Sequence, residues 1–313
     1  MNVISRFLAQ NKLMILDGAL ATELEGKGLD LNDTLWSAKV LAEQPQFIEQ
    51  VHYEYFLAGA DIATTASYQA SVEGFMKKGY TEEEACRYIT DSVKIAVRAR
   101  DRFWADEKNR AGRPRPLIAG SVGPYGAYLA DGSEYRGDYK IAEADLAAFH
   151  RSRIRLLVEA GVDFLACETI PCLWEAQVIA KVVGEFPDLC CWISFSCSSP
   201  DTVCDGTSAK VCAAAMDVYP QVAAIGINCT PPQYIPALLD EMGAATQKPL
   251  AVYPNSGEVY DPVTKTWHGT GEAGAFAAAS RLWHQHGARL IGGCCRTTPA
   301  HIEQVLGWVS QLR

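Results

Sequence analysis

The stretch "LIGGCCRTTP" (residues 290–299) ends an apolar run with two glycines and two adjacent cysteines. Successive side chains of an extended backbone point to opposite faces, so Cys294 and Cys295 are unfavourable as a pair of packing residues. A disulfide between them is also disfavoured, because adjacent residues rarely reach the required separation and dihedral angle without strain. The two thiols therefore indicate a chemical role at the end of a buried strand.

Seven further short apolar runs resemble the one before these cysteines, which makes eight in all. The eight runs are LMILD (13–17), IATTA (62–66), LIAGS (117–121), DFLACE (163–168), WISFS (192–196), AIGIN (224–228), LAVYP (250–254) and RLIGG (289–293). Helical composition occurs between them, as at 47–60, 82–104, 144–162 and 272–288. Apolar runs separated by helices are what a parallel sheet covered on both faces requires. We therefore predict an α/β protein built as a single (β/α)8 TIM barrel, with residues 1–313 as one domain.

Two other architectures fit the length of 313 residues less well. Two small domains would need a boundary, but no linker, low-complexity tract or sustained charge run divides the chain. An open doubly wound sheet would favour a glycine-rich nucleotide loop, but no Gly-x-Gly-x-x-Gly follows the first run and no Gly-x-x-x-x-Gly-Lys-Ser/Thr occurs. The barrel remains the expected fold.

Composition excludes several classes of partner. A hydrophobic content of 49%, 21% charged residues and a mean hydropathy of −0.03 fit a soluble globular protein without a membrane span. The net charge of −9 argues against a nucleic-acid partner, which would favour a basic surface. Charged and polar residues interrupt the apolar N-terminal stretch, unlike in a signal peptide. Eleven cysteines then indicate buried thiols in a reducing compartment, so we expect a cytoplasmic protein.

Polar and reactive residues close the apolar runs, and in a barrel these strand ends form the catalytic face. They are Asp17, Thr65, Tyr68, Glu168, Asn228, Cys229, Tyr253, Asn255, Cys294 and Cys295. Three cysteines should meet at this rim, because the sixth and eighth strands are two apart around a closed barrel. The Gly- and Tyr-rich segment 124–140 follows the third run and is a candidate active-site lid.

Three thiolates suit zinc, with bonds of about 2.3 Å and a fourth tetrahedral position left open for catalysis. We predict one Zn²⁺ per chain, bound by Cys229, Cys294 and Cys295. Gly292 and Gly293 are expected to let the backbone bend so that both neighbouring thiols face the metal. The same two glycines could instead mark a phosphate site after the last strands, although the thiols that follow argue against it. The other eight cysteines are interpreted as small buried hydrophobes.

The pairs Asp17-Gly18 and Asn228-Cys229, together with the run 292–295 (Gly-Gly-Cys-Cys), resemble the homocysteine S-methyltransferases, zinc enzymes with a (β/α)8 fold. The resemblance covers essentially the whole chain. The compact length and the ending GGCCRTTPAHI are most similar to the bacterial and plant enzymes that use S-methylmethionine. The long C-terminal extension of the betaine-using branch is absent, as are the cobalamin and folate modules of the large methionine synthases.

This resemblance implies that the substrates are homocysteine and a small sulfonium donor, S-methylmethionine or S-adenosylmethionine, and that the product is methionine. It implies no cobalamin, folate, nucleic acid or membrane partner, and we expect a monomer. Glu168, with Asp17 nearby, is implied to bind the homocysteine ammonium, while backbone amides around Gly18 and Thr65 bind its carboxylate. Asn228 is a further candidate substrate contact.

Aromatic faces attract a desolvated cation, so Trp36 and Tyr68 are candidates to surround the sulfonium, with Tyr125 and Tyr128 as further ones. His268 is a candidate substrate contact in the loop after the seventh run. Simple packing of the aromatic rings, and helix capping by the two carboxylates, are the alternatives. Two other functions also stay open: a barrel enzyme acting on a phosphorylated metabolite with a structural or redox cysteine site, and a zinc-storage or binding module.

Overall fold

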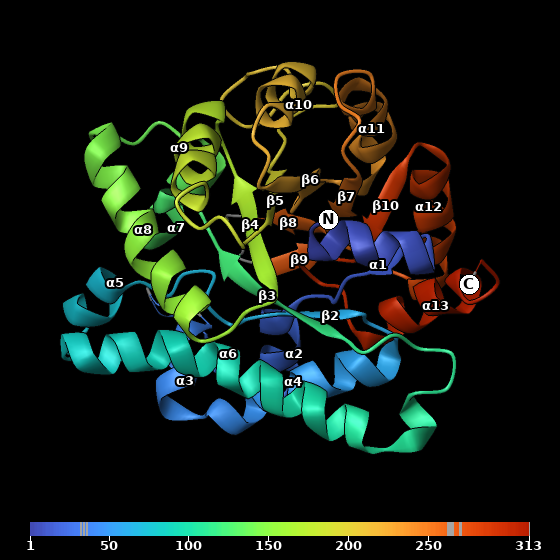
Figure 1. Cartoon of the computed structure of the whole chain (residues 1–313), viewed down its shortest axis with the longest axis horizontal. Coiled ribbons are helices and arrows are strands. Elements are labelled where there is room, and N and C mark those ends of the chain that lie inside the picture. Colours follow the sequence, from blue (N-terminus) through green and yellow to red (C-terminus); the bar gives the residue numbers. More distant parts are fainter. Residues whose placement is uncertain (32, 34, 36, 262–265, 269–270, 313) are drawn as a thin grey trace.

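Eight parallel strands form the barrel that the apolar runs predict (Figure 1). The computed structural model describes residues 1–31, 33, 35, 37–261, 266–268 and 271–312. The barrel strands are β1 (Met14–Ile15), β2 (Ile62–Thr64), β3 (Leu117–Val122), β4 (Phe164–Ile170), β5 (Cys191–Phe195), β6 (Val222–Asn228), β7 (Leu250–Tyr253) and β10 (Ala288–Ile291). Each of them overlaps one predicted run, so the predicted fold class is confirmed.

The strands follow one another around the ring in the order β1-β10-β7-β6-β5-β4-β3-β2. Carboxylates bridge the seam where β1 meets β2. Ile15 N donates to Asp61 Oδ2 at 2.7 Å, and Asp61 N donates to Ile15 O at 2.7 Å. Thr64 N donates to Asp17 Oδ2 at 2.7 Å. Two buried aspartates therefore help to close the barrel.

Helices cover the outside of the strand ring (Figure 1). They are α1 (Val3–Asn11), α2 (Leu20–Gly26), α3 (Ala38–Glu43), α4 (Pro45–Ala58), α5 (Val72–Lys77), α6 (Glu82–Ala105), α7 (Tyr125–Leu129), α8 (Glu143–Glu159), α9 (Leu173–Val183), α10 (Ala209–Asp217), α11 (Ile235–Gly243), α12 (Ala273–Gln285) and α13 (Pro299–Val309). Short 3₁₀ helices lie at Glu107–Asn109, Ser133–Tyr135 and Pro232–Tyr234. The four predicted helical stretches correspond to α4, α6, α8 and α12. The longest, α6, begins with a capping box in which Glu84 N donates to Thr81 Oγ1 and Thr81 N donates to the Glu84 carboxylate.

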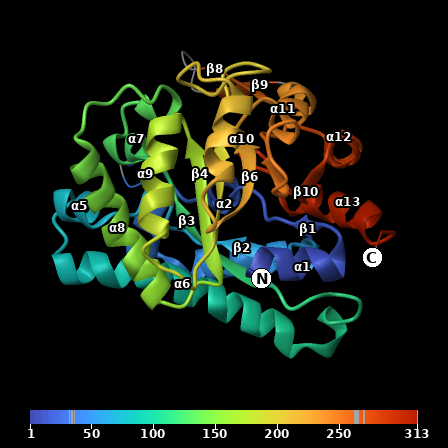
Figure 2. The same ribbon diagram turned by 45° about the horizontal axis from the view of Figure 1, so that its top comes forward.

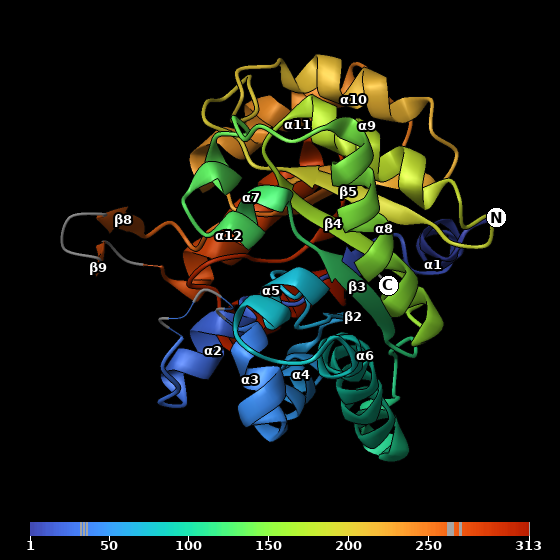
Figure 3. The same ribbon diagram turned by 90° about the vertical axis from the view of Figure 1, so that its left-hand side faces the viewer.

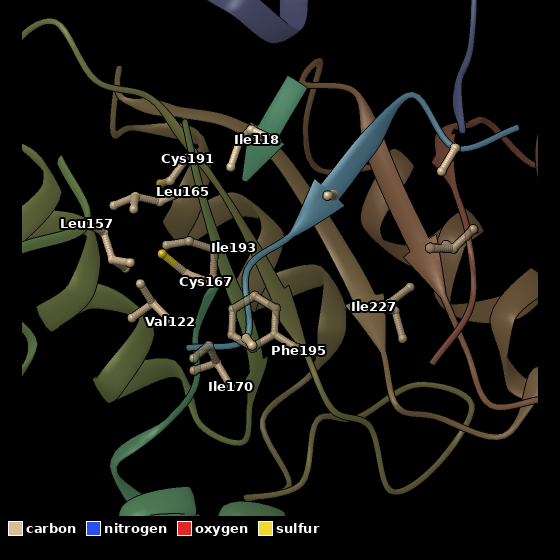
Figure 4. Close-up of a cluster of buried hydrophobic side chains, with 14 of the residues drawn as sticks. Ile118, Val122, Leu157, Leu165, Cys167, Ile170, Cys191, Ile193, Phe195 and Ile227 are labelled. Atoms are coloured by element: carbon tan, nitrogen blue, oxygen red, sulfur yellow. The ribbon is translucent and has the colours of Figure 1, made fainter. Parts of the chain in front are cut away.

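Two apolar layers hold the fold together. The outer layer lies between strands and helices, and Figure 4 shows Ile118, Leu165, Cys167, Ile193 and Phe195 within it. The inner layer fills the barrel with a few large side chains and many alanines. The members of the inner layer include Met14, Phe164, Trp192, Leu290, Ala119, Ala166, Ala224 and Ala251.

Helix α1 closes the amino-terminal end of the barrel, a feature that the apolar runs did not predict. Its buried residues Ile4 and Phe7 join the inner layer. Asn2 caps the helix, with Ser5 N donating to Asn2 Oδ1 at 2.8 Å. Helix α1 therefore blocks the amino-terminal end of the barrel and leaves the carboxyl-terminal end as the place for a cavity.

An antiparallel hairpin of β8 (Val259–Asp261) and β9 (Thr266–His268) follows β7. Figures 2 and 3 place this hairpin and α1 at opposite ends of the molecule. The hairpin was also not predicted, and it extends the wall at the carboxyl-terminal rim. Within the described residues, no helix has the length and apolarity that crossing a bilayer requires.

Candidate active site

The structure brings the three predicted thiols together at the carboxyl-terminal rim. Cys229 follows β6, and Cys294 and Cys295 follow β10. The Sγ atoms of Cys229 and Cys295 are 3.6 Å apart, those of Cys294 and Cys295 are 4.0 Å apart, and all three lie within 4.8 Å of one another. Backbone bonds to the β7 end hold them there, because Cys229 N donates to Tyr253 O at 3.3 Å and Cys294 N donates to Pro254 O at 2.7 Å.

The spacing of the three sulfurs fits a tetrahedral metal ion. Metal–sulfur bonds of about 2.3 Å at tetrahedral angles require sulfurs roughly 3.8 Å apart, and the two hydrogen-bonded pairs lie at 3.6 and 4.0 Å. Hydrogen bonds from the Cys229 and Cys294 thiols lower the pKa of Cys295 well below its usual value. Hydrogen bonding to the other two sulfurs and burial raise the pKa of Cys294. The cluster is therefore able to hold a soft divalent metal, whose binding must displace protons.

Gly292 and Gly293 serve a different purpose from the predicted one. Neither has a left-handed φ, which occurs instead at Cys229 (49°) and Arg296 (66°). A Cβ on Gly292 would lie 2.5 Å from Leu16 Cβ, and one on Gly293 would lie 2.4 Å from the Thr297 hydroxyl oxygen. The two glycines therefore do not supply a left-handed conformation, and they allow β10 and its following turn to pack closely.

The thiols face a cavity of about 520 Å³. Most of the residues predicted for the strand ends line it. These are Asp17, Gly18, Thr65, Tyr68, Glu168, Asn228, Tyr253 and the three cysteines. The cavity is large enough for two amino-acid-sized ligands side by side.

Glu168 projects from β4 into this cavity as a half-buried carboxyl group. Ser121 Oγ donates to Glu168 Oε1, and the Tyr253 hydroxyl also hydrogen-bonds the carboxyl group. Burial, with a further contribution from the nearby Asp17, raises the pKa of Glu168 to about 7. A cationic ligand group would relieve this penalty, because an opposite charge favours the ionised carboxylate.

Asp17 lies beside Glu168, but Thr64 satisfies its two carboxylate oxygens. Oδ2 accepts from Thr64 N at 2.7 Å, and Oδ1 accepts from Thr64 Oγ1 at 2.8 Å. Burial raises the pKa of Asp17 to about 6. The structure thus gives Asp17 a bond across the barrel seam in addition to its place on the cavity wall.

Thr65 and Gly18 both occupy tightly packed positions. The Thr65 hydroxyl accepts from Ser121 N at 2.9 Å, so the Thr65 side chain links the end of β2 to β3. A Cβ on Gly18 would lie 2.8 Å from the Tyr55 hydroxyl and 2.9 Å from the Thr297 hydroxyl oxygen. Only a glycine fits there, because Tyr55 and Thr297 occupy the space that a side chain would need.

Tyr68 is held in place by hydrogen bonds from Gly123 and Arg153 to its carbonyl oxygen. Gly123 N donates to Tyr68 O at 3.3 Å, and a Cβ on Gly123 would lie 2.8 Å from the Tyr68 ring. Arg153 Nη1, from α8, also donates to Tyr68 O at 3.3 Å. The hydroxyl hydrogen-bonds Thr169, and burial raises the pKa of Tyr68 well above its usual value. Its ring is therefore held as a neutral phenol on the cavity wall.

A buried polar network extends outward from Arg153. Its Nη2 donates to Gly123 O and to His150 Nδ1, the latter at 3.0 Å. The other ring nitrogen of His150 then carries the proton and donates to Glu175 Oε1 at 2.8 Å.

Glu175, on α9, ties this network to the segment that follows β3. Its Oε1 also accepts from Tyr125 N at 2.6 Å, and its Oε2 accepts from the Tyr139 hydroxyl. The side chains of Arg153, His150 and Glu175 are all fully or almost fully buried. Together they anchor both ends of the segment predicted as a lid.

This lid segment supplies four cavity-lining residues that were not predicted, namely Ala130, Gly132, Glu134 and Tyr135. The Tyr135 hydroxyl lies 3.4 Å from Cys229 Sγ, within hydrogen-bonding distance for sulfur. The surrounding glycines and tyrosines signalled a loop, but they did not show which side chain would turn inward.

Comparison with known proteins agrees with this geometry. Residues 14–309 match the family model described as homocysteine S-methyltransferase. The chain is 56% identical over 313 residues to homocysteine S-methyltransferase YbgG of Bacillus subtilis, covering 100% of this chain and 99% of that protein. The chain belongs to the homocysteine S-methyltransferase family. It is therefore a methyltransferase, and the resemblance seen in the sequence is confirmed.

Another similar member of the family is homocysteine S-methyltransferase of Escherichia coli, 48% identical over 302 residues and covering 96% of each chain. The crystal structure of the E. coli homocysteine methyltransferase MmuM in its metallated form superposes with a TM-score of 0.88 at 44% identity. That superposition covers 98% of this chain and 100% of the MmuM chain.

Two predicted aromatic contacts of this methyltransferase, Tyr125 and Tyr128, lie away from the cavity. Tyr125 and Tyr128 pack on Phe149, with ring centroids 5.0 and 5.3 Å from it, and neither lines the cavity. Their predicted place beside the sulfonium is therefore wrong for this cavity, because both rings pack on Phe149 of α8 outside it. Trp36 and the side chain of His268 lie outside the described residues.

Proposed function

We propose that this methyltransferase transfers a methyl group from S-methylmethionine to the sulfur of homocysteine, forming methionine, with one Zn²⁺ per chain held by Cys229, Cys294 and Cys295. The carrying observation is the three-sulfur cluster, whose spacing fits zinc and which opens into a cavity lined by carboxylates. S-adenosylmethionine is a second donor of the same chemical class. The similar proteins of B. subtilis and E. coli are named homocysteine S-methyltransferases, which supports homocysteine as the acceptor.

Zinc bound by three cysteines supplies a Lewis acid that makes the acceptor thiol a thiolate near neutral pH. The thiolate sulfur then forms a bond to the methyl carbon, and the bond from that carbon to the sulfonium sulfur breaks. The electron pair stays on the departing sulfur, and the acceptor thiol proton is released to solvent. With S-methylmethionine, both products are methionine.

The chain's own residues contribute orientation and exclusion of water. Opposite charges are lost in this step, so a cavity that keeps water from both sulfurs favours the transition state over the separated reactants. Glu168 binds the homocysteine ammonium, with Asp17 beside it. Backbone amides near Gly18 and Thr65 take the carboxylate, and Asn228 supports that wall.

The donor's sulfonium lies against aromatic rings in this proposal. Tyr68 offers the face of a neutral phenol, whose quadrupole attracts a desolvated cation by up to about 2 kcal/mol. Trp36 is proposed to contribute in the same way. Because a neutral ring attracts the cation less strongly than a carboxylate would, less stabilisation is lost as the sulfonium charge disappears in the transition state.

The cavity does not favour a phosphorylated metabolite. Arg296 is the one cationic side chain among the described residues that line it, and Glu258 already pairs with it at 2.6 Å. A structural cysteine site would have no need of a cavity at its open side. We further propose that residues 1–313 act as one homocysteine-binding unit, as a cytoplasmic monomer, without cobalamin, folate, nucleic acid or membrane.

The direct test is formation of methionine by the zinc-loaded protein from homocysteine and S-methylmethionine, with S-adenosylmethionine in a parallel reaction. We expect methionine from S-methylmethionine, and no turnover by Cys229→Ala although its circular dichroism matches the parent protein. Absence of methionine with both donors would overturn the proposal. Global unfolding of Cys229→Ala would favour a structural metal site.

A further inference from the structure

The carboxylates that line the active-site cavity are mostly satisfied by the protein itself. Thr64 bonds both oxygens of Asp17, Ser121 donates to Glu168, and Lys78 pairs with Asp33 at 2.9 Å. Glu134 differs, because its half-buried carboxylate has no hydrogen-bond or ion-pair partner within the described part of the chain. Glu25, the remaining acidic lining residue, is exposed to solvent. Glu134 is thus available for a ligand.

The fold holds Glu134 in place although nothing bonds its carboxylate. A Cβ on Gly126 would lie 2.4 Å from Glu134 N, so α7 packs directly against the backbone of this residue. Ser133 N donates to Asp131 Oδ1 at 2.9 Å, and Gly132 adopts a left-handed φ of 80°. The tight turn orders the backbone that carries Glu134 before a ligand arrives, which reduces the entropy lost on binding.

Glu134 and Glu168 reach the cavity from different segments, Glu134 from the loop after β3 and Glu168 from β4. Burial, together with the nearby Cys229 and Asp131, raises the pKa of Glu134 to about 7. The pKa of Glu168 responds instead to Asp17 and then to Cys229. The next residue, Tyr135, reaches Cys229 directly from the lid. The cavity that holds the three thiols therefore has carboxylates from two separate segments in its wall.

The chemistry decides which cation a carboxylate should face. The sulfonium charge disappears in the transition state, so a carboxylate against it would stabilise the ground state more and slow the step. The ammonium group of an amino-acid donor keeps its charge throughout. In-line displacement also places the donor and acceptor sulfurs on opposite sides of the methyl carbon, so the two substrates need separate carboxylates.

We infer that Glu134 binds the α-ammonium group of the amino-acid methyl donor and selects donors that carry one. This inference rests on the proposed function, since it assigns one wall of the same cavity to the second substrate. Glu168 then binds the ammonium group of homocysteine, and Glu134 binds the ammonium group of the donor. Tyr68 and the other aromatic residues are left to face the sulfonium.

The test compares two donors and two variants. S-methylmethionine is compared with 4-(dimethylsulfonio)butanoate, the same molecule without its ammonium group. Glu134→Gln removes the charge at similar size, and Asp131→Asn is the matched control, because it removes a charge from the same turn and keeps the acceptor for Ser133 N. Calorimetric titration of S-methylmethionine into each protein gives a readout independent of turnover.

We expect Glu134→Gln to raise the KM and Kd for S-methylmethionine about 10- to 100-fold, as loss of a hydrogen bond to a charged group would do. The KM for homocysteine and the rate with the butanoate donor should stay within about twofold, and Asp131→Asn should resemble the parent protein. A rise in the homocysteine KM, equal losses with both donors, or no change with S-methylmethionine would each overturn the inference. If the parent protein forms no methionine with any sulfonium, the proposed function itself fails.

Discussion

Asn228 and Thr169 exchange two hydrogen bonds across neighbouring walls of the barrel mouth. Thr169 N donates to Asn228 Oδ1 at 2.7 Å, and Asn228 Nδ2 donates to Thr169 Oγ1 at 2.7 Å. Ser194 Oγ donates to the same amide oxygen at 2.8 Å. Thr169 holds a left-handed φ of 60°, at an irregular point in the pairing of β4 with β5. The amide next to Cys229 therefore maintains a strained turn beside Glu168.

Asn228→Ala should lower the free energy of unfolding by about 1–3 kcal/mol, because it leaves the buried Thr169 N–H without its acceptor. Urea denaturation measures this. Thr169→Gly is the informative partner, since it relieves the left-handed strain of about 1 kcal/mol or more while removing the hydroxyl. Asn228→Ala made in the Thr169→Gly background should then cost less than in the parent protein. Equal costs in the two backgrounds would contradict the coupling.

Glu175→Gln should destabilise the protein by about 1–3 kcal/mol, because a carboxamide cannot accept from all three donors that surround this buried carboxylate. Glu185→Gln is the matched control: it breaks an exposed ion pair with Arg151 at 2.7 Å and should cost less than about 1 kcal/mol. Thermal and urea unfolding of both variants give the comparison. A cost for Glu175→Gln no larger than that of Glu185→Gln would refute the anchoring role of the network.

Gly292→Ala should destabilise the protein by about 1–3 kcal/mol or more, since the added Cβ meets the β1 backbone and Leu16. Gly307→Ala provides the control. That glycine lies within α13 with nothing within 4 Å of the added atom, so alanine should stabilise the helix by up to about 1 kcal/mol. Opposite shifts in the denaturation midpoint are expected. Tolerance of Gly292→Ala would show that close packing does not explain this glycine.

The KM for homocysteine should rise as the pH falls through the pKa of Glu168, which burial raises to about 7. Above that pH the carboxylate is charged and can pair with the acceptor ammonium, and below it the group is neutral. Initial rates from about pH 8 to about pH 6 measure the effect. Glu168→Gln should show a high KM that lacks this pH dependence. An unchanged pH profile in Glu168→Gln would mean that another group binds the ammonium.

The features that could be predicted from the sequence are those whose signal is local or topological. Buried parallel strands read as short apolar runs, so all eight were found. Closure of those runs into a ring then required that Cys229 meet Cys294 and Cys295, although 65 residues separate Cys229 from Cys294. The family followed from the same few residues. None of these steps needed the conformation of a loop.

The remaining features depend on contacts that sequence reasoning does not see. Gly292 and Gly293 were interpreted as points where the backbone bends. The structure shows that a side chain at either position would collide with Leu16 or Thr297. Tyr125 and Glu134 both lie in the segment after β3. Only the packing of Tyr125 on α8 and of Glu134 against α7 determines that the glutamate, and not the tyrosine, lines the cavity. Arg153 was not singled out from the sequence, because its carbonyl partners, Tyr68 O and Gly123 O, come from other elements of the fold.

X-ray absorption at the zinc edge tests the central claim most directly, because it counts the sulfur atoms around the metal with and without homocysteine. We predict three sulfurs at about 2.3 Å in the zinc-loaded protein and four after homocysteine is added. A count that stays at three with saturating homocysteine would contradict the claim that the substrate sulfur takes the open position of the cluster formed by Cys229, Cys294 and Cys295.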